Sequence, residues 1–212
     1  NPTGLFYNPE ELRTFAENHP DNLFIIDEAF IDFLQNVQSL IQDRPPNVIV
    51  LRSMTKFYAV PGMRLGYAIA DSEIAERLRN TLPPWTLNCF AERFGQKALE
   101  DDDFAAKSRE FVSNRRSELQ GELNHIDGLT CFPGEANFLL VKINRGDLSA
   151  TSLQQKLLKR GVAIRPCANF AGLNDRFFRV AVRAKKENEY LVNHLRAVVQ
   201  KAPFKKKEKW KE

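Results

Sequence analysis

The stretch that decides the fold is residues 47–70, which read NVIVLRSMTKFYAVPGMRLGYAIA. It contains two apolar runs of strand length, at 48–51 and at 65–70, and Lys56 lies in the segment that connects them. Continuous apolar runs bounded by turn residues are typical of strands in a sheet that is buried on both faces. We therefore expect two strands of one buried sheet, with polar side chains where the first strand ends.

The same organisation continues upstream. The segment Asn8-Pro9-Glu10-Glu11 combines a capping Asn, a Pro at the first helical position and carboxylates at the positive end of the helix dipole, which predicts a helix to about Asn18. An apolar run at 23–27 follows and ends in a carboxylate. Strands that alternate with helices predict an α/β fold.

Downstream of residue 70 the pattern is helical from 72 to 123, with a break at Pro83-Pro84. The stretch 103–123 predicts one long helix whose apolar face contains Phe104, Phe111, Leu119 and Leu123. Beyond it, the expected elements are strands near 129–132, 137–142, 162–165 and 177–182, and helices near 149–160 and 185–199. We expect a large domain at 1–122, a smaller α+β domain at 123–200 and a Lys-rich tail at 201–212.

Composition excludes several classes of protein. With 43% apolar and 27% charged residues, the 212-residue chain resembles an ordinary globular protein, and its net charge of +4 needs no nucleic acid to explain it. Apolar runs fall short of the roughly 20 residues that span a bilayer, so no membrane segment is expected. The three cysteines show neither metal-ligand nor disulfide spacing, which favours a reducing cytoplasm and no metal.

Residues whose side chains can bind a ligand or take part in catalysis follow the expected strands, and this is where ligands bind in open α/β sheets. Hydroxyl donors and a guanidinium suit a phosphate, and Ser53, Thr55 and Arg64 supply them. The amine of Lys56 can condense with an aldehyde, because neighbouring cations favour loss of its proton. A carboxylate such as Asp27 can keep a pyridine nitrogen protonated. Each residue alone is common in turns and on surfaces, but together they favour a cofactor site.

Four segments carry a family resemblance. In order, they are Asn1-Pro2-Thr3-Gly4, Asp27-Glu28-Ala29-Phe30, Ser53-Met54-Thr55-Lys56 and Arg64-Leu65-Gly66-Tyr67. They resemble the successive motifs of fold-type I pyridoxal-phosphate enzymes, the class I/II aminotransferase superfamily. The resemblance implies a three-layer α/β large domain, incomplete here at its N-terminus, together with the smaller α+β domain. It also implies a homodimer that binds pyridoxal 5'-phosphate.

The resemblance assigns roles to individual residues. Lys56 is similar to the lysine that forms the Schiff base with the cofactor, and Asp27 to the catalytic partner of the pyridine nitrogen. Asn1 is similar to the asparagine that binds the cofactor's phenolic oxygen, and the phosphate-binding positions are matched by Ser53, Thr55 and Arg64. In the smaller domain, the residues expected to bind substrate are Asn137, Arg165 and Arg179.

Three segments, at 53–67, 164–170 and 177–183, most resemble the threonine-phosphate decarboxylase branch of the superfamily. That branch converts L-threonine O-3-phosphate to (R)-1-amino-2-propanol phosphate in cobalamin biosynthesis. We expect Arg179 to bind the substrate carboxylate and Arg165 its phosphate. Many aminotransferases have Tyr where this chain has Phe30, which cannot donate a hydrogen bond, and this departure favours the decarboxylase branch. The alternative interpretation is that Phe30 is a core substitution with no bearing on the type of reaction. The alternatives are a histidinol-phosphate-type aminotransferase that uses 2-oxoglutarate, and an inactive fragment of such an enzyme.

Overall fold

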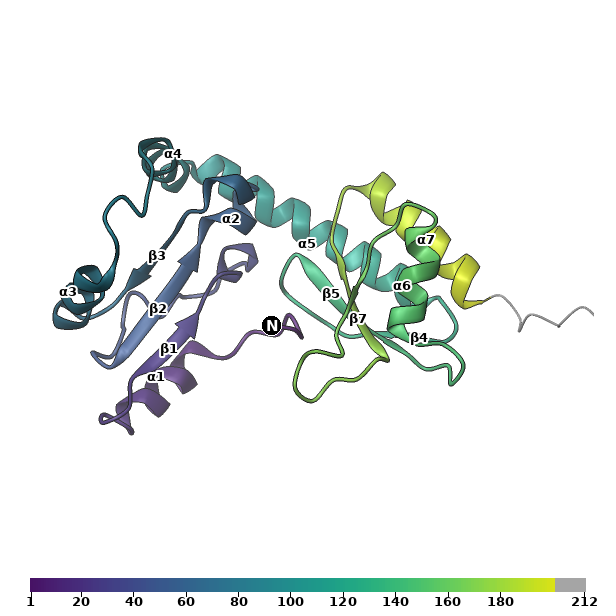
Figure 1. The fold of residues 1–212 in the computed structure, drawn as a ribbon, viewed down its shortest axis with the longest axis horizontal. Helices are drawn as coiled ribbons and strands as arrows, with labels where there is room; N and C mark the ends of the chain where they lie inside the picture. Colours follow the sequence, from purple (N-terminus) through teal and green to yellow (C-terminus); the bar gives the residue numbers. More distant parts are fainter. Residues whose placement is uncertain (201–212) are drawn as a thin grey trace, which may run out of the picture. The chain divides into compact units, whose positions relative to one another are not determined.

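The computed structural model describes residues 1–200 of the chain (Figure 1). It divides into two compact units: one is Leu5–Ser113, and the other joins Asn1–Gly4 to the chain from Asn114 onward. The division falls within the long helix α5 (Asp102–Asn124), which also contains the expected boundary at residue 122. The expected Lys-rich tail, 201–212, lies outside the described residues.

The unit Leu5–Ser113 is built on a three-stranded sheet in the order β1-β2-β3 (Figure 1). β1 (Phe24–Asp27) and β2 (Val48–Ser53) are parallel, and β3 (Gly66–Ile69) is antiparallel to β2. The carboxyl ends of β1 and β2 therefore lie at the same edge of the sheet, and β3 begins at that edge. This topology brings the residues that the sequence predicts to bind a cofactor to one edge of the sheet.

Helix α1 (Pro9–Glu17) confirms the predicted start signal, since the side chain of Asn8 accepts a hydrogen bond of 2.9 Å from the Glu10 amide. Its Ala16 packs with the buried Val48 and Val50 on one face of the sheet. The opposite face is open at Ile25, which is 62% exposed. The prediction of burial on both faces is therefore wrong for β1, whose residues alternate between covered and open sides.

The remaining elements of this unit surround the strand ends. The break at Pro83-Pro84 is confirmed, because it separates α3 (Ser72–Thr81) from α4 (Cys89–Leu99). Three short helical turns were not predicted from the sequence. η1 (Ile31–Phe33) follows β1, α2 (Met54–Phe57) follows β2, and η2 (Pro61–Met63) precedes β3. Lys56 therefore lies on a turn of helix that directly continues β2.

The second unit is the expected α+β arrangement. Its antiparallel sheet has the order β4-β5-β7-β6, and α6 (Ala150–Leu158) packs against α7 (Lys185–Val199). The strands are β4 (Leu129–Cys131), β5 (Phe138–Ile143), β6 (Arg165–Pro166) and β7 (Phe177–Ala181). The expected strand at 162–165 is shorter than predicted. The amide of Val162 donates to the Leu157 carbonyl at the end of α6, so it is not available to the sheet.

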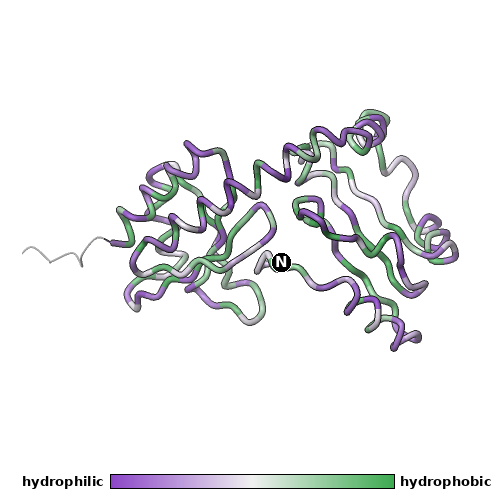
Figure 2. The backbone as a smooth tube through the Cα atoms, turned by 180° about the vertical axis from the view of Figure 1, so that it is seen from behind, coloured by the Kyte–Doolittle hydropathy of each residue, from purple (hydrophilic) through white to green (hydrophobic). Residues whose placement is uncertain are grey.

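Helix α5 corrects a second expectation. Leu119 and Leu123 are buried in the second unit, as predicted, but Phe104 and Phe111 are 39% and 50% exposed. The apolar positions of a helix that serves two units need not share one core. Figure 2 shows hydrophobic residues along the strands of each sheet, whereas hydrophobic and hydrophilic residues alternate along the helices. Among the helices of residues 1–200, none is both long and apolar enough to cross a membrane.

Candidate active site

The side chains of Ser53, Thr55 and Lys56 meet at the carboxyl end of β2. The Lys56 Nζ donates to the Ser53 Oγ over 2.9 Å, and the Ser53 and Thr55 hydroxyl oxygens are 2.9 Å apart. The Lys56 Nζ also lies 5.6 Å from the centre of the Phe30 ring, which comes from the segment after β1. An amine beside two hydroxyl groups suits a ligand that has both an aldehyde and a phosphate.

Asp27 is the last residue of β1, and it is exposed at the same edge of the sheet. Its Oδ1 accepts a hydrogen bond of 2.9 Å from the Ala29 amide, which orients the carboxylate. Asp27 aligns with Leu51, two residues before Ser53, so side-chain alternation directs Asp27 and Ser53 to the same face of the sheet. The structure therefore brings the expected carboxylate to the edge that presents the lysine.

Arg64 lies at this edge as well, two residues before β3 begins. Its backbone is left-handed, with φ 53° and ψ 42°, and its Nη1 donates to the Pro61 carbonyl over 2.9 Å. Gly66 allows β3 to approach, because a Cβ at this position would lie 2.8 Å from the Arg52 carbonyl oxygen. Strained backbone of this kind is common at functional sites.

A buried ion cluster lies on the opposite face of the same strand ends. The Arg52 Nη1 is 3.5 Å from the Glu28 Oε2, and its Nη2 pairs with the Asp32 Oδ1. Glu28 is 6% exposed and accepts hydrogen bonds from the Ser39 hydroxyl (2.6 Å) and the Leu40 amide (3.0 Å). Sequence reasoning missed this cluster. The feature of the sequence that could have indicated the cluster is Arg52, a charged residue at a strand position whose side chain is directed inward by the alternation of the strand.

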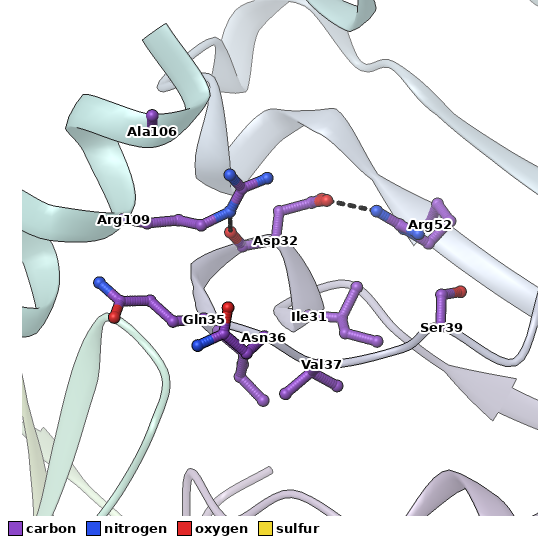
Figure 3. A pocket seen from close by; sticks show the side chains of 10 residues that line it. Ile31, Asp32, Gln35, Asn36, Val37, Ser39, Arg52, Ala106 and Arg109 are labelled. Atoms are coloured by element: carbon purple, nitrogen blue, oxygen red, sulfur yellow. Dashed lines mark hydrogen bonds and ion pairs between the residues drawn. The ribbon is translucent and has the colours of Figure 1, made fainter. Parts of the chain in front are cut away.

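A cavity of about 460 Å³ lies beside this cluster. Figure 3 shows the side chains that line it. Asp32 and Arg52 line it together with Arg109 of α5, whose Nε donates to the Asp32 carbonyl over 3.0 Å. Gln35 and Asn36 add amide groups to the wall (Figure 3). Both carbonyl and carboxylate of Asp32 are thus held by arginines, and the segment after β1 is fixed at two points.

The two expected substrate arginines lie together in the second unit. Arg165 of β6 and Arg179 of β7 are directly opposite each other in the sheet. Each guanidinium carbon lies 5.7 Å from the centre of the Phe170 ring, and that of Arg179 lies 4.5 Å from the Phe138 ring. Sequence reasoning missed this aromatic support, since nothing in the spacing links Phe170 to both arginines. Two adjacent guanidinium groups suit a ligand with two anionic groups.

Arg179 has unused capacity for an anion. Its Nε is buried and has no hydrogen-bond partner within the described residues. Burial lowers the pKa of Arg179; Cys167 opposes this shift, and the charge of Arg165 adds to it. Its Nη1 donates to the Oδ1 of Asn1. A carboxylate or phosphate at this position would satisfy the Nε and offset the repulsion between the two cations.

The sequence-predicted residues thus fall into two groups. The first group lies in the unit Leu5–Ser113, and the second lies in the other unit. Asn137 of the second group precedes β5, and its backbone oxygen accepts from the Val182 amide over 2.8 Å. The members of the first group are Asp27, Ser53, Thr55, Lys56 and Arg64, and those of the second are Asn1, Asn137, Arg165 and Arg179.

Comparison with known proteins identifies the class. The family model "Aminotransferase class I and II" matches residues 1–195, so the chain belongs to this family of pyridoxal-phosphate-dependent enzymes and has its α/β fold. The superfamily and fold expected from the four motifs are confirmed.

Among particular proteins, the chain is 38% identical to threonine-phosphate decarboxylase of Salmonella typhimurium, over 94% of this chain and 55% of that protein. It is also similar to the crystal structure of histidinol-phosphate aminotransferase from Clostridium acetobutylicum. That likeness has a TM-score of 0.86 and 35% identity, and covers 93% of this chain and 61% of that one. Histidinol-phosphate aminotransferase from Sinorhizobium meliloti, solved with pyridoxal-5'-phosphate, shares the fold with a TM-score of 0.85 and 23% identity, over 94% of this chain and 55% of that one. The chain thus spans little more than half the length of these relatives.

Proposed function

We propose that the complete protein is a pyridoxal-phosphate-dependent enzyme that decarboxylates L-threonine O-3-phosphate. The products are carbon dioxide and (R)-1-amino-2-propanol phosphate. The observation that carries the choice of substrate is the pair Arg165 and Arg179, which places two guanidinium groups opposite each other over one aromatic ring. The similarity to the Salmonella decarboxylase supports the same choice.

The strand-end group fits the cofactor. Ser53, Thr55 and Arg64 offer two hydroxyl groups and a guanidinium for the phosphate, and the Lys56 amine is held 2.9 Å from the Ser53 hydroxyl. Asp27 is exposed at the same edge, and within residues 1–200 its Oδ2 has no hydrogen-bond partner. That oxygen is therefore available to hold a proton on a pyridine nitrogen.

When bound, pyridoxal phosphate supplies an electron sink for the electron pair that remains at the substrate Cα. Whether carbon dioxide or a proton leaves would depend on which bond at Cα the protein aligns with this electron sink. Arg179 would control this choice by holding the carboxylate, while Arg165 holds the phosphate at the other end of the substrate. Lys56 would then return a proton to Cα in place of the lost carboxylate.

The number of anionic groups favours phosphothreonine over histidinol phosphate. Phosphothreonine has a phosphate and a carboxylate, so it engages both arginines at once, and bidentate geometry suits each contact. Histidinol phosphate has a phosphate but no carboxylate, and would leave one guanidinium unpaired. The aminotransferase function remains the second candidate, because the similarity to the Clostridium enzyme is nearly as high and its partner substrate 2-oxoglutarate has two carboxylates.

The test is a direct comparison of the two reactions with the complete protein and added pyridoxal phosphate. One sample receives L-threonine O-3-phosphate, and released carbon dioxide is measured. The other receives histidinol phosphate and 2-oxoglutarate, and glutamate is measured. We expect carbon dioxide release and little glutamate.

Two variants make the comparison specific. Lys56→Ala should abolish the reaction, whereas Lys97→Ala removes a lysine of the same unit whose ammonium pairs with Glu100, and should leave the reaction intact. Glutamate formation without carbon dioxide release would instead establish the aminotransferase. Homodimerisation stays a prediction from the family resemblance, and a cytoplasmic location stays a prediction from the pattern of the cysteines.

A further inference from the structure

The buried ion cluster lies directly behind the residues proposed to bind the cofactor. Along β1 and β2, Phe24, Ile26, Val48 and Val50 belong to one packed cluster on the covered face, and Ile25 and Leu51 point to the open face. By the same alternation, Asp27 and Ser53 belong to the open face and Arg52 to the covered one. The cluster and the proposed site thus share two strand ends but occupy opposite faces.

Arg52 connects the two segments that carry the site. It precedes Ser53 by one residue, and its guanidinium contacts carboxylates on both sides of Phe30, those of Glu28 and Asp32. The segment held in this way begins immediately after Asp27 and includes the ring that lies 5.6 Å from the Lys56 Nζ. Glu28 is itself fixed, since its backbone amide donates to the Leu51 carbonyl over 2.9 Å.

We propose that Arg52 is a positioning residue that, through Glu28 and Asp32, fixes Asp27 and Phe30 relative to the turn of helix that carries Lys56. This inference rests on the proposed function, since it concerns how the same site is kept in register. A guanidinium contacts two carboxylates at once because it presents five donors in a fixed fork, and an ammonium cannot reproduce that geometry. Catalytic groups must be held to within about 0.5 Å, which requires supporting contacts of this kind.

The low exposure of the three side chains indicates that their ion pairs hold the two segments together and are not solvated surface pairs. The side chains of Arg52, Glu28 and Asp32 are 12%, 6% and 18% exposed, so their attraction is weakly screened by water. The pKa of Tyr67, which aligns with Arg52 on β3, is raised foremost by burial, while Arg52 lowers it. Loss of one partner leaves an uncompensated charge at a largely buried position, which favours movement of the segment from Glu28 to Asp32.

The segment that leads into β2 supplies a matched control. Arg44 is also partly buried, and its Nε, like that of Arg52, has no hydrogen-bond partner within the described residues. Its Nη1 donates to the carbonyls of Pro45 (3.1 Å) and Val48 (2.9 Å), where β2 begins. Arg44→Lys therefore makes the same chemical change at the end of β2 that is remote from Lys56.

The experiment compares Arg52→Lys, Arg44→Lys and wild type in the complete protein. Three quantities are measured: the dissociation constant of pyridoxal phosphate, the visible absorbance band of the lysine-bound cofactor as a function of pH, and the urea midpoint of the cofactor-free protein. We expect both variants to lower the midpoint. Only Arg52→Lys should raise the dissociation constant, by about tenfold or more, and shift the pH dependence of the band.

Glu28→Gln serves as a second variant should Arg52→Lys fail to fold. It keeps the acceptor for the Leu40 amide but removes the charge that faces Arg52, and we expect the same shift in cofactor affinity. Equal cofactor affinity in Arg52→Lys or Glu28→Gln and in Arg44→Lys would overturn the positioning role. A wild-type protein whose absorbance band is absent, or survives Lys56→Ala, would instead overturn the proposed function, and this inference with it.

Discussion

Arg165 and Arg179 face each other directly across two antiparallel strands. Like charges in this position are destabilising, by a few tenths of a kcal/mol up to about 1 kcal/mol. The Phe170 ring lies within cation–π distance of both guanidinium groups and reduces this cost without removing it. A pair of residues that costs stability and leaves a buried Nε without a partner is better suited to binding a ligand than to holding the fold together.

This arrangement predicts opposite effects of one substitution on stability and on binding. Arg165→Gln relieves the repulsion, so the free energy of unfolding without ligand should stay equal or rise slightly. The KM for L-threonine O-3-phosphate should rise by about tenfold or more, because a charge-assisted contact to the phosphate is lost. Urea unfolding and steady-state kinetics measure the two quantities.

Lys156→Gln is the control, since it removes an exposed cation from α6 of the same unit. It should change neither quantity appreciably. A KM that is unchanged in Arg165→Gln would remove Arg165 from the substrate site and leave it a surface charge at the end of a strand.

At the scale of elements, local signals were sufficient where the determining interactions are themselves local. The cap at Asn8 and the break at Pro83-Pro84 act within a few residues, and the helices begin and end close to where they were predicted. Burial depends instead on partners that are distant in sequence. The open face at Ile25 and the exposure of Phe111 were therefore not predictable from apolar periodicity.

The cap of α1 gives a direct test at this scale. Asn8→Ala removes the acceptor for the Glu10 amide, and we expect the free energy of unfolding to fall by about 1 kcal/mol. Asn22→Ala is the matched control, because within residues 1–200 the Asn22 side chain makes no hydrogen bond. Equal stability of the two variants in urea unfolding would show that the cap contributes nothing measurable.

The candidate site was likewise predictable only in part: the residues at the strand ends were predicted, and the residues that support them were not. Asp27, Ser53, Thr55, Lys56 and Arg64 follow or precede strands, so the sheet topology alone brings them to one edge. The ion cluster of Arg52, Glu28 and Asp32 depends on which face of that sheet is covered, and Phe170 becomes relevant only once β6 and β7 pair. The ion cluster and Phe170 both support residues that the sequence predicted to bind cofactor or substrate, but the sequence assigned no role to the supporting residues themselves.

At the scale of the whole molecule, the residues proposed for the cofactor belong to one compact unit, with the exception of Asn1, which belongs to the same unit as the residues proposed for the substrate. The chain spans little more than half the length of relatives such as the Salmonella decarboxylase. The complete protein is therefore the right material for every test of activity, and the central claim is the covalent attachment of the cofactor at Lys56.

That attachment can be measured directly. The complete protein is incubated with pyridoxal phosphate, reduced with sodium borohydride to fix the cofactor to the amine that it has joined, and digested for peptide mass spectrometry. We expect the added mass on the peptide that contains Lys56, and its loss in Lys56→Ala but not in Lys97→Ala. Modification of a different lysine, with Lys56 unmodified, would contradict the account.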